Sequence, residues 1–324
     1  MSSATRQAPS AMKVAAAFTT VYLVWGSTYF FIRLSVEHVP PMLVGAFRYF
    51  PAGLLMLLWC VVTGERIFSL RAIRPAVISG LLLLVGGNGL LIWSEQYIPS
   101  SLAAILLASG PIWFVVLDKG KWRENFQNKA TVSGLIVGSI GVLLLFGEKL
   151  VSETGDLAGK SGSSKGMIAL AALVVASISW AAGSLYSKYK AAGNSNAVNA
   201  GWQMMAAGIA FLACSGVAGE WRDFRPGEVP MLSWISIAYL VVMGSLVAYS
   251  AFTWLLQVRP AAQVSTHAYV NPVVAVLLGV IFIGERLSWL QVLGLMVILC
   301  SVLLINLAKY RGSAGSRAFK LKAG

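Results

Sequence analysis

Apolar residues are grouped along the chain in ten continuous stretches, and short segments between them hold most of the charged residues. A helix needs about 20 apolar residues to cross the roughly 30 Å hydrocarbon core of a bilayer. The stretches do not alternate apolar and polar residues as the strands of a membrane barrel do, so the pattern predicts membrane-spanning helices. The predicted spans are Val14–Ile32, Pro41–Val62, Ala76–Ser94, Ser100–Leu117, Ala130–Gly147, Gly166–Ser187, Ala197–Val217, Met231–Leu256, Ala261–Ile283 and Leu287–Ala308.

The composition agrees with this pattern. The chain is 57% hydrophobic and only 11% charged, whereas soluble domains carry about 25% charged residues. Lipid offers no hydrogen-bond partners, so the backbone groups of each span must pair within a helix. We therefore predict an all-α integral membrane protein with ten transmembrane helices.

The net charge of +13 would also suit a protein that binds nucleic acid, but the basic residues are distributed by side. If the N-terminus is cytoplasmic, 17 of the 25 Lys and Arg residues fall in cytoplasmic segments, seven fall in the outer loops, and Arg48 lies within a span. Cytoplasmic loops of membrane proteins carry such an excess of basic residues. We therefore expect both termini to be cytoplasmic, the lipid bilayer as partner, and no nucleic-acid partner.

The second half of the chain repeats features of the first. At an offset of 155 residues, Trp25 corresponds to Trp180, Arg48 to Gln203 and Gly53 to Gly208. At an offset of 161, residues Trp93, Gln96, Pro99, Pro111 and Glu124 correspond to Trp254, Gln257, Pro260, Pro272 and Glu285. Each half holds five predicted helices, an odd number, so the second half enters the membrane from the opposite side. Many secondary transporters have this inverted-repeat architecture.

The repeat divides the chain into segments. We predict a cytoplasmic N-terminus over 1–13, a first five-helix repeat over 14–147 and a second over 166–308. The segment 148–165 is rich in Gly, Ser and mixed charge and predicts a flexible extracytoplasmic linker. The segment 309–324 is expected to be a basic cytoplasmic tail with a disordered end.

Ionisable residues within the spans are candidates for function, because each costs about 2.5–3.5 kcal/mol at the bilayer centre. Arg48 lies roughly 10 Å below the outer surface at 1.5 Å per residue, and Glu95 ends the third span on the same side. We expect them to form an ion pair that either fixes two spans or acts as an outer gate. Contact of Arg48 with a substrate carboxylate is the alternative.

Three further polar or kinked positions are candidates. Asn88 lies among glycines and could either line a cavity or tie two helices together. His267 is the only histidine within a span, and it is a candidate for proton coupling or for a structural hydrogen bond. Pro111 and Pro272, which correspond in the repeat, predict helix kinks.

Aromatic residues are abundant within the spans. Trp25 and Trp180 correspond in the repeat and lie at depth, with Tyr29 and Tyr249 in the same aromatic set. Their rings could stack on an apolar or aromatic substrate or hold a cation. Packing between helices is the alternative for each residue.

The chain resembles the bacterial drug/metabolite transporter superfamily, EamA type. The residues that carry the resemblance are Trp25-Gly26-Ser27-Thr28-Tyr29, Gly87-Asn88-Gly89, Tyr269-Val270-Asn271-Pro272-Val273-Val274-Ala275 and Gly284-Glu285. The resemblance implies ten helices in two inverted halves around a central cavity, a bacterial inner-membrane location, and export of amino acids or other small metabolites. It also implies a substrate-binding role for Trp25, Ser27, Asn88, Trp180, Tyr269 and Asn271.

We therefore expect a secondary transporter that exports small metabolites, foremost amino acids, by alternating access. A multidrug or cationic-compound exporter is the closest alternative. A phosphorylated-metabolite exchanger ranks lower, because it would need several deep cations and only Arg48 is deep. The chain has no His-Glu-x-x-His zinc motif and no Walker motif, so we expect no enzyme, no metal and no cofactor. We expect a monomer, and Gly134-x-x-x-Gly138 leaves a dimer as the alternative.

Overall fold

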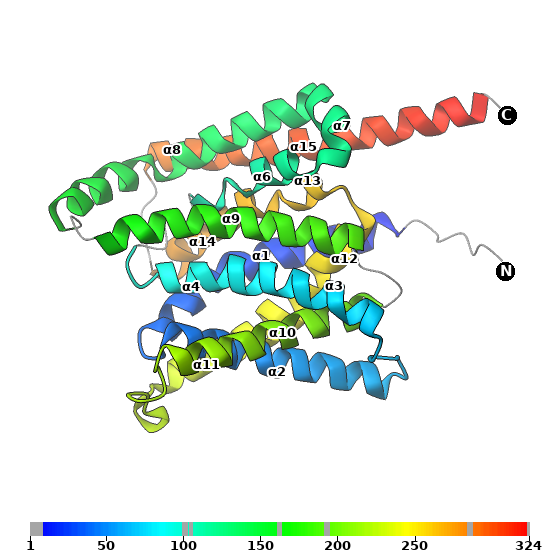
Figure 1. Ribbon diagram of the computed structural model, residues 1–324. Coiled ribbons are helices and arrows are strands. Elements are labelled where there is room, and N and C mark those ends of the chain that lie inside the picture. Colours follow the sequence, from blue (N-terminus) through cyan, green and yellow to red (C-terminus); the bar gives the residue numbers. More distant parts are fainter. Residues whose placement is uncertain are drawn as a thin grey trace.

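The computed structural model describes residues 9–98, 103, 106–160, 164–190, 195–283 and 288–322. In this part of the chain all regular structure is helical, and the helices form one bundle (Figure 1). The all-α prediction is therefore confirmed for the residues that are described.

Six helical segments are long and apolar enough to cross a membrane, and all six match predicted spans. Four of them are α1 (Ala11–Val36), α2 (Pro41–Val62), α9 (Ser164–Lys190) and α10 (Asn196–Val217). The other two are composite. One joins α3 (Leu70–Gly80), the π-helical η1 (Leu81–Gly89) and α4 (Leu90–Ser94), and the other joins α11 (Met231–Tyr239), the π-helical η4 (Leu240–Tyr249) and α12 (Ser250–Val258).

The remaining four predicted spans are shorter or interrupted in the described residues. The fifth and tenth contain the apolar helices Lys129–Leu144 and Trp289–Ile305, which belong to α8 (Lys129–Lys160) and α15 (Trp289–Lys322). The fourth ends in α6 (Gly110–Leu117), and its first residues lie partly outside the described ranges. The ninth is divided at Ser265–Thr266 into α13 (Ala261–Val264) and α14 (His267–Ile283). Short helices η2 (Lys119–Lys121), α7 (Trp122–Gln127) and η3 (Pro226–Glu228) lie in the connections.

Two predicted loops are largely helical. Helix α8 continues to Lys160, so it covers most of the segment 148–165 that was expected to be a flexible linker. Helix α15 continues to Lys322, through the predicted basic tail. Both segments contain many residues with good helix propensity, which outweigh the few glycines and serines: Glu148, Lys149, Leu150, Glu153, Leu157 and Ala158 in the first, and Lys309, Arg311, Ala314, Arg317, Ala318, Lys320 and Leu321 in the second.

The two prolines that predict kinks lie in different settings. Pro272 is inside α14, a few residues after the break at Ser265–Thr266. Pro111 is in the first turn of α6, where its missing N–H removes no helical hydrogen bond. Pro111 therefore does not kink a continuous helix; it lies at the start of a new one.

Helices α2 and α10 pack closely against each other through glycines. A methyl group at Gly53 would lie 2.5 Å from the backbone nitrogen of Met205, and one at Gly208 would lie 2.5 Å from backbone atoms of Phe50. Met205 and Phe50 are themselves 155 residues apart, as are Gly208 and Gly53. The two contacts are therefore reciprocal under the repeat.

Helices α8 and α15 also pack through small residues. Methyl groups at Gly134, Gly138 and Gly141 would come within 3 Å of Ile305, Ser301 and Ile298, and the Ser301 hydroxyl donates to the Gly134 carbonyl at 2.7 Å. The small-residue motif of the fifth predicted span is therefore used within the chain.

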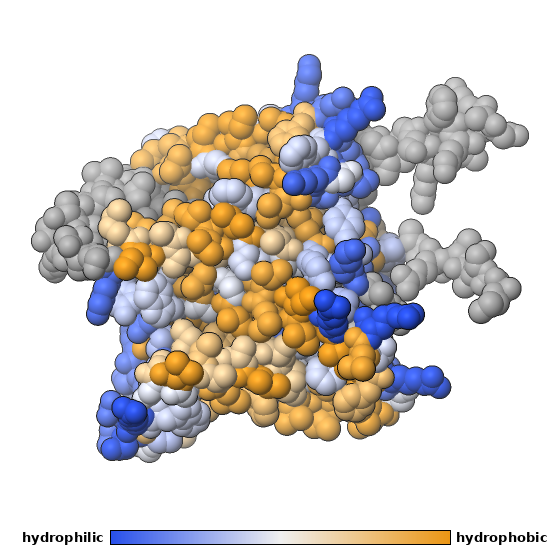
Figure 2. Space-filling model, viewed as in Figure 1, coloured by the Kyte–Doolittle hydropathy of each residue, from blue (hydrophilic) through white to orange (hydrophobic). Residues whose placement is uncertain are grey.

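The beginning of α1 and the end of α15 lie at the same end of the bundle (Figure 1), which we call the terminal end. Hydrophilic residues gather at the two ends, and apolar residues cover much of the sides of the helices (Figure 2). Large apolar side chains on these sides are exposed, among them Leu58, Trp59, Val62, Ile136, Leu143, Met296 and Leu303. Such a broad exposed apolar surface is typical of a protein that is surrounded by lipid.

Candidate functional site

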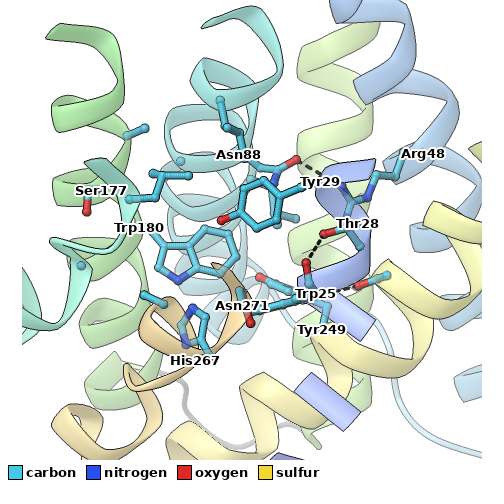
Figure 3. Close-up of a pocket in the computed structure, with 18 of the residues that line it drawn as sticks. Trp25, Thr28, Tyr29, Arg48, Asn88, Ser177, Trp180, Tyr249, His267 and Asn271 are labelled. Atoms are coloured by element: carbon cyan, nitrogen blue, oxygen red, sulfur yellow. Dashed lines mark hydrogen bonds between the residues drawn. The ribbon is translucent and has the colours of Figure 1, made fainter. Parts of the chain in front are cut away.

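A cavity lies in the middle of the bundle, where residues from both halves of the chain meet (Figure 3). The first half contributes side chains from α1, α2, η1, α4 and α6, and the second half contributes side chains from α9, η4 and α14. The polar and aromatic residues that line it are Trp25, Thr28, Tyr29, Arg48, Tyr49, Asn88, Phe114, Ser177, Trp180, Tyr249, His267 and Asn271.

One wall of the cavity is aromatic. The rings of Trp25 and Trp180 are 5.3 Å apart between centroids at an interplanar angle of 79°. Phe252 is fully buried and packs against both indoles, with centroids at 4.9 and 5.5 Å. The His267 ring lies 5.2 Å from Trp25 and 5.2 Å from Phe252. Edge-to-face arrangements of this kind stabilise aromatic clusters, so the wall is a preformed apolar surface.

The polar groups of this wall differ in how they are satisfied. Trp25 Nε1 donates to the Gly244 carbonyl at 3.1 Å, whereas the buried Nε1 of Trp180 has no hydrogen-bond partner. His267 Nδ1 lies 2.9 Å from the Val264 carbonyl. Asn271 is 4% exposed, and its buried Oδ1 has no partner. Because buried polar atoms are usually hydrogen-bonded, Trp180 Nε1 and Asn271 Oδ1 make one donor and one acceptor of this wall candidates for contact with a ligand.

A second part of the cavity wall holds a buried cation. Arg48 is 4% exposed, and its Nε donates to Ser245 Oγ at 3.0 Å and its Nη1 to Asn88 Oδ1 at 3.3 Å. The Tyr49 hydroxyl also donates to Asn88 Oδ1, at 2.9 Å, and the guanidinium carbon lies 4.8 Å from the centre of the Tyr49 ring. Neutral oxygens and one ring thus surround this positive charge.

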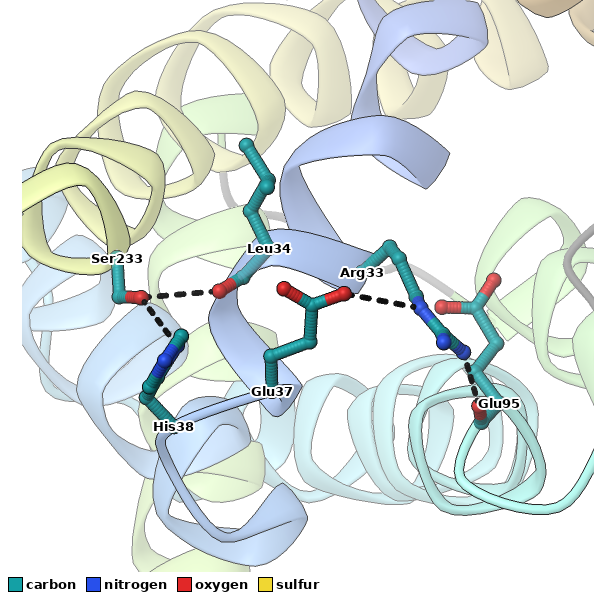
Figure 4. Close-up of polar contacts among 6 residues, drawn as sticks. All are labelled: Arg33, Leu34, Glu37, His38, Glu95 and Ser233. Carbon is teal, nitrogen blue, oxygen red and sulfur yellow. Dashed lines mark hydrogen bonds and ion pairs between the residues drawn. The ribbon is translucent and has the colours of Figure 1, made fainter. Parts of the chain in front are cut away.

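Arg48 does not pair with Glu95 as the sequence suggested. The ion pairs among the described residues join Arg33 to Glu37 and Lys121 to Glu124. Glu95 is fully buried, and its backbone carbonyl accepts from Arg33 Nη1 at 3.2 Å (Figure 4). The side chain of Arg48 extends to η4 and η1, where it donates to Ser245 and Asn88.

The position that corresponds to Arg48 in the repeat is Gln203, and its environment is similar but closed. Gln203 Nε2 donates to Ser79 Oγ at 2.8 Å and to Ser187 Oγ at 3.0 Å, and its Oε1 accepts from the Tyr249 hydroxyl at 2.8 Å. Tyr249 is 161 residues after Asn88, so the corresponding residues are hydrogen-bonded in both halves. Gln203 does not line the cavity, and its amide hydrogens are both used.

Most residues proposed from the sequence line the cavity: Trp25, Tyr29, Arg48, Asn88, Trp180, Tyr249, His267 and Asn271. Ser27 and Tyr269 do not. The Ser27 hydroxyl contacts the Val24 carbonyl and the Tyr239 hydroxyl, both at 2.7 Å. The Tyr269 hydroxyl donates to the Leu135 carbonyl at 3.1 Å, on the side of α14 that faces α8.

Several residues of the site were missed by sequence reasoning. Tyr49, Thr28 and Ser177 line the cavity, Ser245 holds Arg48, and Phe252 supports the indoles. Tyr49 adjoins Arg48 in the sequence and could have been suspected on that ground. The others are common residues of apolar helices, and no spacing singles them out.

Ties between helices lie at both ends of the cavity. At the terminal end, Lys188 Nζ of α9 donates to the carbonyls of Leu256 and Arg259, where α12 finishes, and the Tyr189 hydroxyl donates to Asp118 Oδ1 at 2.8 Å. At the other end, Arg33 joins α1 to the end of α4 (Figure 4). There too, the Ser233 hydroxyl donates to the Leu34 carbonyl at 3.0 Å and contacts His38 Nδ1 at 3.3 Å.

Comparison with known proteins places this site in a family context. The profile of the EamA-like transporter family matches residues 12–147 and 167–307, one match for each half. Within the described residues, no group of three or more His, Cys, Asp and Glu side chains could hold a metal ion.

Individual proteins match along most of the chain. The protein named "Uncharacterized inner membrane transporter YedA" of Escherichia coli (strain K12) is 35% identical over 301 residues, which are 91% of this chain and 90% of that protein. Protein PecM of Dickeya dadantii is 24% identical and covers 87% of this chain and 89% of its own length. A solved crystal structure superposes with a TM-score of 0.71 at 18% identity, and it covers 93% of this chain and 99% of its own, which shows a shared fold.

Proposed function

The chain belongs to the EamA-like transporter family, and we propose that it is a secondary transporter that exports small metabolites. We propose amino acids with an apolar or aromatic side chain as its preferred substrates. The observation that carries this proposal is the central cavity, which combines an aromatic wall, few fixed charges and two unsatisfied polar atoms. Such a cavity suits a small ligand with an apolar body and a few polar groups.

We propose that the two halves form an inverted repeat of ten spans and move against each other. The reciprocal glycine contacts of α2 and α10 support a twofold relation between the halves. The π-helical segments η1 and η4 support it further, because they lie at corresponding positions of the two halves. A cavity at the interface of two such repeats can open to either side in turn.

The ties at the two ends suggest how the cavity closes. Lys188 with α12 would form the gate at the terminal end, and Arg33 with α4 the gate at the opposite end. Alternating access requires that only one of these two gates be open at a time. The excess of Lys and Arg in the predicted cytoplasmic segments supports a cytoplasmic terminal end, and the name of the Escherichia coli relative supports an inner-membrane location.

Export of cationic drugs fits the site less well. The indoles of Trp25 and Trp180 could hold a cation, but Arg48 places a buried positive charge in the same cavity. A phosphorylated substrate would need several cations, and Arg48 is the one that lines the described part of the cavity. The cavity is enclosed by elements of one chain, so we propose a monomer as the working unit.

Counterflow in proteoliposomes tests the function. The purified protein is reconstituted, loaded with unlabelled compound, and exposed to a panel of labelled amino acids and to labelled tetraphenylphosphonium. We expect transient, saturable accumulation of at least one apolar or aromatic amino acid. Accumulation of tetraphenylphosphonium alone would favour the cationic-drug alternative, and no accumulation of any compound would contradict transport of these classes.

Substitution of Trp180 tests the role of the aromatic wall. Trp180→Ala should weaken the affinity for the transported amino acid about tenfold, because aromatic contacts are worth up to about 1.5 kcal/mol each. The matched control is Trp289→Ala, since Trp289 is 79% exposed on α15, away from the cavity. Equal effects of the two substitutions, or an unchanged affinity in Trp180→Ala, would remove the stacking role.

A further inference from the structure

We propose that Arg48 binds the carboxylate of the substrate, so the transported class is small organic carboxylates, amino acids included, and not cations. This inference rests on the proposed transport function. It begins from the charge of the cavity. Arg48 is 4% exposed, and no carboxylate of the described residues lies within 4.0 Å of its guanidinium.

A buried charge without a counter-charge is unusual. Removing an ion from water costs several kcal/mol, and neutral hydrogen-bond partners recover only part of this cost. Buried charges in proteins are therefore usually paired or bound to a ligand. Ser245 and Asn88 orient the guanidinium but contribute no negative charge. The missing counter-charge points to an anionic group that enters from the cavity.

The guanidinium has donors left for such a group. Of its five N–H donors, one on Nε and one on Nη1 have acceptors among the described residues. Its Nη2 edge lies beside Gly244, where a Cβ atom would come within 3.1 Å of Nη2. Gly244 also lines the cavity. The absence of a side chain at this position thus keeps the Nη2 edge accessible, and two parallel N–H donors match the geometry of a carboxylate.

The other half of the chain provides an internal comparison. Gln203 corresponds to Arg48, but its amide donates both N–H groups to Ser79 and Ser187 and accepts from Tyr249. It does not line the cavity, and it carries no charge. Gln203 thus shows that a neutral side chain with hydrogen-bond partners is enough to join helices at this position of the repeat. Arg48 differs in its charge, in its spare donors and in its access to the cavity.

Other atoms of the cavity fit the same class of ligand. Asn271 Oδ1 can accept a hydrogen bond from an ammonium, amide or hydroxyl group, and Trp180 Nε1 can donate one. Trp180 lies across the cavity from Arg48 (Figure 3), whereas Trp25 is nearer to it, since Trp25 Nε1 donates to the carbonyl of Gly244 beside the guanidinium. A ligand with a carboxylate at one end and an apolar body satisfies both walls.

The test compares acids with their amides in the counterflow assay. For a transported amino acid, the wild-type protein should be inhibited about tenfold more strongly by the acid than by its carboxamide, because the amide oxygen can still accept a hydrogen bond from Arg48 but carries no negative charge. Arg48→Gln should abolish this preference, and Arg48→Lys should keep part of it. The control Arg222→Gln, which removes an exposed arginine, should leave the preference unchanged.

Thermal unfolding gives a second measurement. Without ligand, Arg48→Gln should unfold at the same temperature as the wild type or higher, because it removes a buried unpaired charge. Stabilisation by the amino acid should be lost. A large drop in unfolding temperature without ligand would show that Arg48 is a structural residue and would overturn the inference.

The possible failures are distinguishable. An equal response of the wild type to acid and amide overturns the role of Arg48 without any variant, even if Arg48→Gln does not insert into the membrane. An acid preference that persists in Arg48→Gln also overturns it, and so does transport confined to tetraphenylphosphonium. The first two results leave the proposed export of amino acids intact. Transport confined to tetraphenylphosphonium replaces the proposed substrate class but not transport itself, whereas absence of flux for every compound of the panel contradicts the proposed function.

Discussion

His267 is a packing residue of the cavity wall and also the candidate for proton coupling. Its ring lines the cavity and packs against Trp25, Trp180 and Phe252. Its Nδ1 is held by the Val264 carbonyl, which directs the other ring nitrogen away from its own helix turn. A histidine in this position can pass a proton only if the cavity admits water or substrate.

Substitution of His267 separates the two roles. If His267 couples protons, His267→Gln should abolish the acceleration of amino-acid uptake by an acid vesicle lumen, while counterflow at equal pH persists, since counterflow is driven by the substrate gradient and needs no pH gradient. Uptake with and without the pH gradient measures this directly. A variant that still responds to the gradient would make His267 a packing residue of the aromatic wall.

At the residue scale, the sequence predicts the members of the site better than their partners. Trp25, Trp180, Asn88 and Asn271 could be proposed because of the repeat and of the resemblance to a family. The contact of Arg48 with Ser245 could not, because it joins residues 197 positions apart on helices whose rotation no pattern specifies. Depth alone suggested Glu95 as the partner of Arg48. Two residues at similar depth can still face different neighbours.

At the scale of elements, the π-helical segments η1 and η4 resemble each other. Each is a π-helical stretch in the middle of an otherwise α-helical span. Such stretches often occur at functional sites, and here Leu84, Gly87 and Asn88 of η1 and Gly244 and Tyr249 of η4 line the cavity. The sequence shows only continuous apolar runs with glycines at these places. It therefore predicted the spans but not the change of helix type within them.

Local preferences also explain the elements that were predicted differently. Glycines and serines in 148–165 suggested a linker, yet α8 continues through most of this segment. Composition averages over a segment, whereas a helix can extend from an existing end at little cost once it is nucleated. Pro111 suggested a kink, but it is in the first turn of α6, where a proline fits without breaking a helical hydrogen bond.

The tie at the end of α12 gives a prediction for the gate. Lys188 Nζ binds the carbonyls of Leu256 and Arg259, and basic side chains stabilise helix C-termini in this way. Lys188→Met should loosen the terminal end. The ratio of molecules whose cavity is open at this end to molecules in which it is closed should rise about tenfold, since hydrogen bonds to charged groups are worth about 1.5–3 kcal/mol.

Accessibility of a cavity cysteine measures this shift. In a background without Cys60, Cys214 and Cys300, Ser177→Cys places a thiol in the cavity wall. An impermeant maleimide added to the terminal side should label it faster in Lys188→Met. Lys190→Met is the matched control, because Lys190 is exposed in the last turn of the same helix. Similar labelling rates in both variants would show that the Lys188 tie is not part of a gate.

At the scale of the whole molecule, the proposed mechanism depends on how the two halves are oriented. The family profile matches each half of the chain once, and the reciprocal contacts of Gly53 and Gly208 support the proposed twofold relation between the halves at α2 and α10. With five spans in each half, as proposed, the second half runs in the opposite direction to the first. This proposal requires the two ends of the chain to lie on one face of the membrane, and the connection between the halves on the other.

Sidedness of labelling tests this arrangement. In the background without native cysteines, single cysteines replace Ser10, before α1, or Ser313, in the last part of α15, and a third replaces Arg222, in the connection between α10 and α11. In spheroplasts, an impermeant maleimide should label the cysteine at position 222 at least about tenfold faster than the cysteines at positions 10 and 313, because basic segments stay cytoplasmic. Labelling of all three after permeabilisation is the control. If one chain end is labelled from outside and the other is not, the number of spans is odd. The two halves can then no longer be an inverted pair around the cavity, and alternating access between them loses its geometric basis.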